Sequence, residues 1–144
     1  MNVEDCLRER ILRVIPKDVS KMNSSLKISE LKLEKARELL NSEFFNESLL
    51  SAYTSMFHAA RALLYYDGFQ EKSHYAVYIY LGEKYSGKIS KTLINVFYTY
   101  QKERHNVLYG FINDINKEYA EEAVCYAEDF LLSIKQILNL NHGK

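Results

Sequence analysis

The scarcity of turn-forming residues is the feature that most constrains this fold. The 144 residues include one proline, Pro16, and five glycines. A sandwich or barrel of many strands needs a tight turn after each strand, and glycine and proline supply most such turns. The sequence therefore predicts an all-α protein, an up-and-down antiparallel bundle of five to six helices. Because the length is close to one domain of ~150 residues, we expect 1–144 to form a single domain.

Hydrophobic periodicity and capping residues indicate where the helices lie. Apolar residues recur at helical spacing between recognisable start and stop signals. They predict helices over about 3–14, 19–40, 47–66, 74–85, 90–108 and from 117 onward. The first helix is expected to stop before Pro16, since the residue preceding a proline avoids the helical region. The last is expected to fray over 139–144, and no segment has the pattern of a strand.

The segment 47–66 is the candidate central helix. Its apolar side chains follow one helical stripe, and small residues such as Ser51, Ser55 and Ala59 flank that stripe. Small side chains let neighbouring helices approach closely. The pattern therefore predicts a helix that is buried on two sides.

Charge, cysteines and hydropathy exclude several classes of protein. The 19 basic residues balance the 19 acidic ones, so the chain lacks the overall positive field of a dedicated nucleic-acid binder. Cys6 and Cys125 are far apart and no histidine pair has ligand spacing, so we expect no disulfide, no metal and no cofactor. No run approaches the ~18 apolar residues of a membrane span. These features favour a cytoplasmic protein that does not contact a membrane.

Charge is nevertheless segregated along the second half of the chain. Residues 83–105 hold five basic side chains against two acidic ones, and residues 112–130 hold one against six. A basic site, if present, should therefore lie in or near 83–105.

The end of the helix over 90–108 carries the candidate site. His105 and Tyr109 are four residues apart and share a helical face. Arg104 adjoins that face and can hold a phosphate through two parallel N–H bonds. We therefore predict Arg104 and His105 as catalytic residues and Lys102, Arg104, His105 and Tyr109 as substrate-binding residues. The alternative is structural, because the negative end of a helix dipole favours basic residues in its last turn.

Three other features of the sequence favour a structural role over a ligand-binding one. His58 and Arg61 lie beside the apolar stripe of 47–66 and are expected to hydrogen-bond to neighbouring helices. His74 is interpreted as a residue of the capping region of its helix. The 12 tyrosines suit half-buried positions and an interface more than base stacking.

Three ordered segments resemble the HEPN superfamily, in particular its small single-domain prokaryotic members. The stretch AYTSMFHAARALL at 52–64 is similar to a characteristic helix of that superfamily, and Lys72-Ser73-His74 resembles its K-S/T-H element. Arg104-His105 with Tyr109-Gly110 is similar to the family's R-x-x-x-D-Y-G ending. The resemblance implies a helical bundle, commonly a homodimer. It also implies binding of RNA or nucleotide, and in many members metal-independent ribonuclease activity or a toxin role opposed by a nucleotidyltransferase partner.

The chain departs from the family's R-x(4–6)-H motif. Arg104 matches the arginine, but Tyr109, Gly110 and Phe111 occupy the positions allowed for the histidine. A tyrosine, with an unperturbed pKa near 10, is poorly matched to proton transfer at neutral pH, whereas a histidine such as His105 is a residue type with an unperturbed pKa of about 6.5 and is better suited. The leading hypothesis is a dimeric nucleotide- or RNA-binding protein with weak or degenerate ribonuclease activity. The competing hypothesis is a non-catalytic module that pairs with a nucleotidyltransferase.

Overall fold

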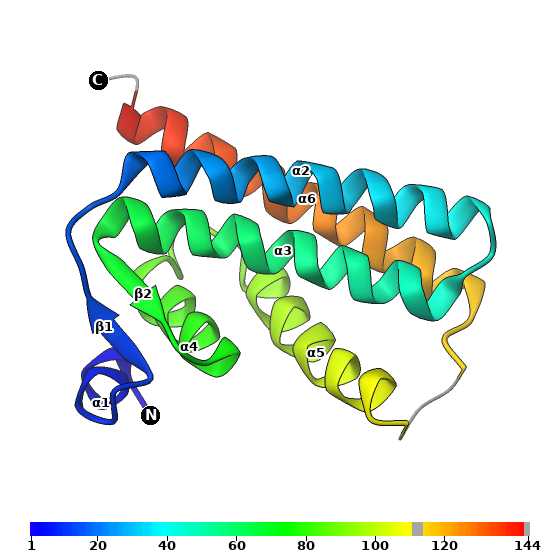
Figure 1. Cartoon of the computed structure of the whole chain (residues 1–144), viewed down its shortest axis with the longest axis horizontal. Helices are drawn as coiled ribbons and strands as arrows, with labels where there is room; N and C mark the ends of the chain where they lie inside the picture. Colours follow the sequence, from blue (N-terminus) through cyan, green and yellow to red (C-terminus); the bar gives the residue numbers. More distant parts are fainter. Residues whose placement is uncertain (111–113, 143–144) are drawn as a thin grey trace.

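Three long helices, α2, α3 and α6, lie side by side along the long axis of the molecule, and α4 and α5 pack beneath α3 (Figure 1). The computed structural model describes residues 1–110 and 114–142, with side chains up to residue 139. The elements in chain order are α1 (Val3–Arg8), β1 (Leu12–Val14), α2 (Val19–Asn41), α3 (Phe45–Asp67), β2 (Phe69–Glu71), α4 (His74–Lys84), α5 (Lys91–Leu108) and α6 (Lys117–His142). The predicted all-α helical bundle is confirmed.

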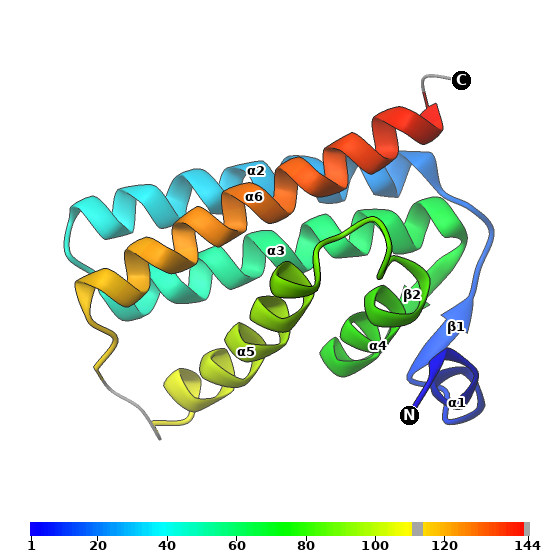
Figure 2. The same cartoon turned by 180° about the vertical axis from the view of Figure 1, so that it is seen from behind.

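Helix α3 is the centre of the bundle. It contacts α2, α4, α5, α6 and β2, and in Figure 2 α6 crosses in front of it while α5 starts beside it and runs away below it. Large side chains such as Tyr53, Met56 and Leu63 are fully buried along it. The apolar stripe predicted for 47–66 is thus the core of the protein.

Small buried serines hold α2 and α3 together. The hydroxyl of Ser29 donates to the carbonyl of Ser55 at 2.7 Å, and the hydroxyl of Ser55 donates to the carbonyl of Ser29 at 2.8 Å. Ser48 donates to the carbonyl of Ala36 at 2.8 Å in the same way. These bonds need a close approach of the two backbones, which the small side chains permit, and they satisfy hydroxyl groups that would otherwise be costly to bury.

The N-terminal segment differs from the prediction. The helix expected over 3–14 ends at Arg8, because Arg10 adopts a left-handed conformation (φ 62°) and the N–H of Ile11 turns back to the carbonyl of Cys6. The chain then forms β1, which pairs antiparallel with β2 and sets Leu12 opposite Glu71. The expectation that no strand forms was therefore wrong. This pairing depends on a partner far along the chain, which local periodicity does not reveal.

The predicted helix boundaries elsewhere are close to those observed. Asp18 caps α2 by accepting from the N–H of Lys21 at 2.9 Å, as its position suggested. Helix α6 extends to His142, and residues 143–144 lie outside the described residues, so the fraying expected over 139–144 stays a prediction. No helix in the described ranges is long and apolar enough to cross a bilayer.

Gly68 ends α3 and places β2. Its φ of 88° lies in the left-handed region, which glycine adopts without strain. A Cβ at this position would lie 2.9 Å from the carbonyl oxygen of Ile15, and that residue's N–H donates to the Gly68 carbonyl. The glycine thus lets the segment after β1 pass close to the end of α3.

Candidate functional site

A cavity of about 220 Å³ lies where α3, the start of α4 and the end of α5 meet. We call it the Arg104 cavity. It is lined by Tyr53, Thr54, Phe57, His58, Arg61, His74 and Arg104. Two arginines, two histidines and a tyrosine therefore share one small space.

Helix α3 supplies most of the lining through its periodicity. Tyr53, Phe57 and Arg61 recur every four residues, and Thr54 and His58 form the neighbouring row, so all five belong to one side of the helix. The buried serines Ser48 and Ser55 lie on the other side of α3, and the apolar stripe shares Tyr53 and Phe57 with the cavity wall. The sequence of this one helix thereby builds both the core and the cavity.

His74 reaches the cavity because of the way α4 begins. The hydroxyl of Ser73 accepts from the N–H of Ala76 and caps the helix, which makes His74 its first residue. The His74 ring stacks on Phe57 with centroids 4.0 Å apart. Its Nδ1 is hydrogen-bonded to the hydroxyl of Tyr53 at 2.8 Å. These contacts fix the position and orientation of the imidazole.

The charges in the cavity are not equally available to a ligand. Arg61 donates two hydrogen bonds to the carboxylate of Glu71, at 3.0 and 2.9 Å, and Glu71 is buried. This bidentate pair neutralises Arg61. In the described part of the chain no carboxylate lies within ion-pair distance of Arg104, which is half-buried at the cavity. Arg104 is therefore the group that gives the cavity its net positive charge.

Both histidines of the cavity are held neutral at physiological pH. Burial, and after it the charge of Arg104, lowers the pKa of His74 to about 4. Burial, and then the charge of Arg61, lowers the pKa of His58. The Nδ1 atom of His58 is buried and has no hydrogen-bond partner in the described structure. Leaving a buried polar nitrogen without a partner is costly, so a bound group that supplied one would be favoured.

The structure does not gather all the predicted site residues into one place. Arg104 lines the cavity, whereas His105 and Tyr109 are exposed, with their rings 4.6 Å apart on the outer surface of α5. Lys102 is also exposed, with its ammonium 4.5 Å from the centroid of the Tyr98 ring. The prediction that His105 and Tyr109 share a face is confirmed. They do not line the Arg104 cavity.

Sequence reasoning undervalued His74 and Tyr53. His74 was interpreted as a residue of the capping region, and it does begin a helix, but its side chain lines the cavity. The available signal was the set of three family-like segments, because each contributes to this cavity. Residues 52–64 supply Tyr53 and His58, the Lys72-Ser73-His74 element supplies His74, and the third segment supplies Arg104.

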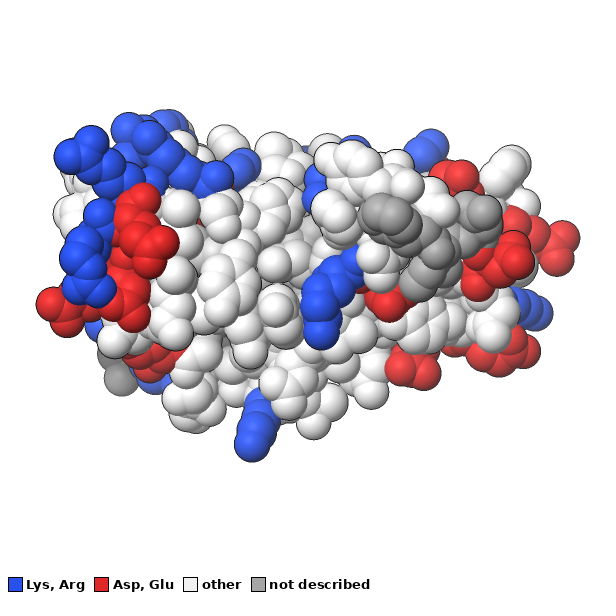
Figure 3. Space-filling model, turned by 90° about the horizontal axis from the view of Figure 1, so that it is seen from below, with Lys and Arg blue, Asp and Glu red and all other residues white. Residues whose placement is uncertain are grey.

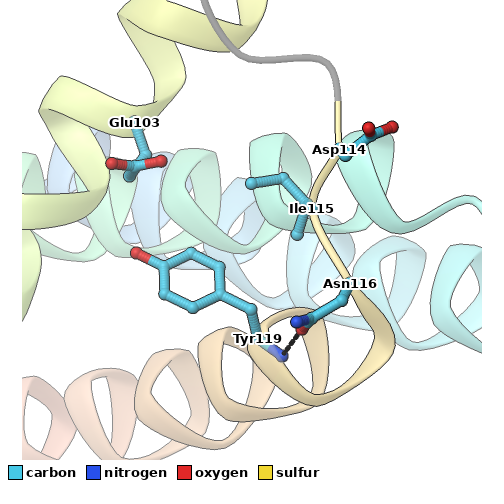
Figure 4. A pocket seen from close by; sticks show the side chains of 5 residues that line it. All are labelled: Glu103, Asp114, Ile115, Asn116 and Tyr119. Carbon is cyan, nitrogen blue, oxygen red and sulfur yellow. Dashed lines mark hydrogen bonds between the residues drawn. The ribbon is translucent and has the colours of Figure 1, made fainter.

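A second hollow lies on the other side of α5 and has the opposite charge. It encloses about 340 Å³ and is lined by Glu103, Asp114, Ile115, Asn116 and Tyr119. Figure 4 shows the Tyr119 hydroxyl pointing to the side where Glu103 lies, with the Asp114 carboxylate turned away. Burial, with the charge of Glu103 adding to it, raises the pKa of Tyr119. Two carboxylates disfavour a phosphate here, so the larger hollow is the poorer candidate for an anionic ligand.

Comparison with known proteins agrees with this geometry. The sequence matches the family model described as the HEPN domain over residues 22–137, which is most of the chain and includes every residue that lines the Arg104 cavity. The chain therefore belongs to the HEPN family, whose domains are typically associated with nucleotides or RNA and often form dimers. Comparison with curated proteins gives no match.

Proposed function

We propose that this protein binds RNA or nucleotides through their phosphate groups, with Arg104 as the principal ligand-binding residue. The observation that supports this most directly is the charge arrangement of the Arg104 cavity. Arg61 is neutralised by Glu71, while Arg104 meets no carboxylate in the described residues. A guanidinium in a partly buried cavity binds phosphate with charge-assisted hydrogen bonds.

We expect any ribonuclease activity to be weak. Metal-independent cleavage needs a group that takes a proton from the ribose 2′-hydroxyl. His105 and Tyr109 lie outside the cavity, and His74 inside it is a poor base because its pKa is about 4. We therefore expect Arg104 to bind the phosphate, and any residual cleavage to depend on Arg104 and His105.

The test is binding and cleavage of a mixed single-stranded RNA pool in EDTA. Arg104→Ala should weaken binding by about tenfold or more, the equivalent of one charge-assisted hydrogen bond. Binding should also weaken with salt, because phosphate contacts release counterions. Arg37→Ala is the matched control, since Arg37 lies on α2, is exposed and pairs with Glu128 at 3.2 Å.

Two outcomes would contradict the proposal. Equal loss of binding in the two arginine variants would indicate only non-specific charge, and absence of binding by the unaltered protein would remove RNA and nucleotides as ligands. Cleavage lost in His105→Ala would instead establish His105 as the residue that moves the proton.

A second candidate function is a protein-interaction module that pairs with a nucleotidyltransferase in a toxin–antitoxin-like system. It is favoured by the face formed by α4 and α5. Figure 3 shows most of the charged side chains near the two ends of this face, and a middle that is mostly uncharged but also carries basic side chains. Tyr75 is exposed on α4, and the rings of Tyr78 and Tyr98 stack nearby with centroids 4.2 Å apart. Exposed aromatic surfaces of this kind are typical of protein interfaces.

The two candidates make opposite predictions. The interaction module should co-purify with a nucleotidyltransferase from the same genome and show no affinity for RNA. RNA binding that depends on Arg104 would exclude an interaction module that has neither catalytic activity nor a ligand-binding site of its own.

A further inference from the structure

The rings of the Arg104 cavity are already packed against protein groups. His74 stacks on Phe57 at 4.0 Å, and the guanidinium of Arg61 lies over the same ring at 4.9 Å. The Tyr53 ring stacks with Phe97 at 5.5 Å and with His74 at 5.8 Å. A nucleobase binds an aromatic pocket by stacking on a free ring face. The aromatic faces of these rings are therefore covered by protein groups, and a ligand in the cavity meets the polar edges of the lining side chains.

The polar groups of the cavity suit an anion with several oxygens. Arg104 supplies a permanent positive charge, and His58, whose buried Nδ1 has no hydrogen-bond partner in the described residues, lines the same space. The cavity also adjoins the first residue of α4, the positive end of that helix dipole. These donors approach from three different elements and surround a space of about 220 Å³.

We propose that the Arg104 cavity is a site for a terminal phosphate, a phosphomonoester, and that His58 and His74 bind it together with Arg104 by taking up a proton. This inference rests on the proposed phosphate binding at the same cavity and narrows its ligand. A phosphomonoester carries three terminal oxygens and nearly two negative charges at pH 7, because its second pKa is about 6. An internal phosphodiester carries one charge and only two such oxygens, and so matches Arg104 alone.

The surrounding charges explain why a proton would accompany the ligand. Arg104 and Arg61 lower the pKa of His74, while Glu71 raises it. Lys32 and Arg61 act on His58 in the same direction as burial, which is the larger cause. Glu71 raises the pKa of both histidines, but its carboxylate is already paired with Arg61, and no carboxylate of the described residues lines the cavity. A bound dianion would supply that compensation and raise the pKa of both histidines.

The experiment is calorimetric titration at pH 7 with one single-stranded RNA hexamer prepared in three forms. The forms carry a 5′-phosphate, a 3′-phosphate or hydroxyl groups at both ends, and a nucleoside monophosphate is titrated separately. Each titration is repeated in two buffers of different ionisation enthalpy, which measures the protons taken up. We expect one phosphorylated form to bind about tenfold more tightly than the hydroxyl form, with uptake of up to one proton.

His58→Gln and His74→Gln identify the residues responsible. Each should remove most of the gain due to the terminal phosphate and reduce proton uptake, so that affinity falls more for the phosphorylated hexamer than for the hydroxyl-ended one. The circular dichroism spectrum of each variant is the control for folding. If a variant fails to fold, the comparison of the three forms with the unaltered protein still decides the question.

The remaining outcomes separate this inference from the proposed function. Equal affinity for all three hexamers without proton uptake would overturn the inference and leave Arg104-dependent RNA binding intact. Failure of every probe to bind would overturn both. Tight, proton-coupled binding of the nucleoside monophosphate alone would support the terminal-phosphate site and show that the ligand is a free nucleotide and not RNA.

Discussion

The histidines His74 and His105 show how much a residue's chemistry depends on its surroundings. His74 packs on Phe57, bonds to Tyr53 and lies near Arg104, whereas His105 is exposed and faces Tyr109. Desolvation and a nearby positive charge both disfavour the imidazolium ion. The half-buried ring of His74 therefore stays neutral at a pH where an unperturbed histidine, with a pKa of about 6.5, would be half charged.

This difference predicts how His74 titrates. Its NMR titration midpoint should lie near pH 4 in the free protein. Between that value and the unfolded value of about 6.5 only the unfolded chain binds the proton, so the free energy of unfolding falls as the pH falls. Solvent screening reduces the effect to about 1 kcal/mol. His74→Gln should remove this part of the pH dependence, and a midpoint near 6.5 would contradict the cavity geometry.

At the scale of elements, packing between α2 and α3 depends on short side chains. Ser29 and Ser55 exchange hydrogen bonds between side chain and backbone, and Ser29 and Ser55 are both fully buried. In a close-packed interior even one added methylene group disturbs the packing. These helices are therefore held at a spacing that larger residues would disturb.

Two substitutions of Ser55 should be distinguishable by chemical denaturation. Ser55→Ala removes one hydrogen bond and should lower the free energy of unfolding by about 1 kcal/mol. Ser55→Leu forces the helices apart and should cost about 2–3 kcal/mol. Equal effects of the two variants would show that spacing is not what these serines maintain.

The end of α3 makes a second prediction at this scale. Gly68→Ala places a Cβ where the left-handed backbone disfavours one and where the Ile15 carbonyl is only 2.9 Å away. The expected loss of stability is about 1–3 kcal/mol. Gly87→Ala is the control, because a Cβ there meets nothing within 4 Å. Thermal unfolding of the two variants side by side measures the difference.

For the whole molecule, charge is arranged around α5. Neighbouring residues Glu103 and Arg104 lie in different hollows, one acidic and one basic. The helix period of 3.6 residues separates adjacent side chains by about 100°, so consecutive residues can serve opposite surfaces. A chain with no net charge can thereby present a local positive site.

Assembly is the prediction at the scale of the molecule. We expect a homodimer, with a light-scattering mass of twice the 16.9 kDa of the chain. The mostly uncharged middle of the α4–α5 face is the surface we expect to be buried, so Tyr75→Glu should shift the mass toward the monomer. Leu132→Glu, which changes an exposed apolar residue of α6, should not. A monomeric mass for the unaltered protein would contradict this prediction.

The sequence by itself determined the helical class and nearly all the helix positions. These depend on spacings of three and four residues, on caps such as Asp18 and Ser73, and on few breakers, all of which are local. It also indicated Arg104, because a basic residue near a helix end is visible in the sequence. It could not show that the side chain of Arg104 turns away from those of His105 and Tyr109.

Only the tertiary structure decided the strand pairing and the membership of the cavity. Arg13 on β1 reaches Gln70 on β2, 57 residues away, and Tyr53 bonds to His74 and Gln101, 21 and 48 residues away. Contacts over such separations follow from how the helices pack, and no local pattern records them. The protonation of the histidines also depends on the tertiary structure, because the burial and the neighbouring charges that set their pKa exist only once the chain has folded.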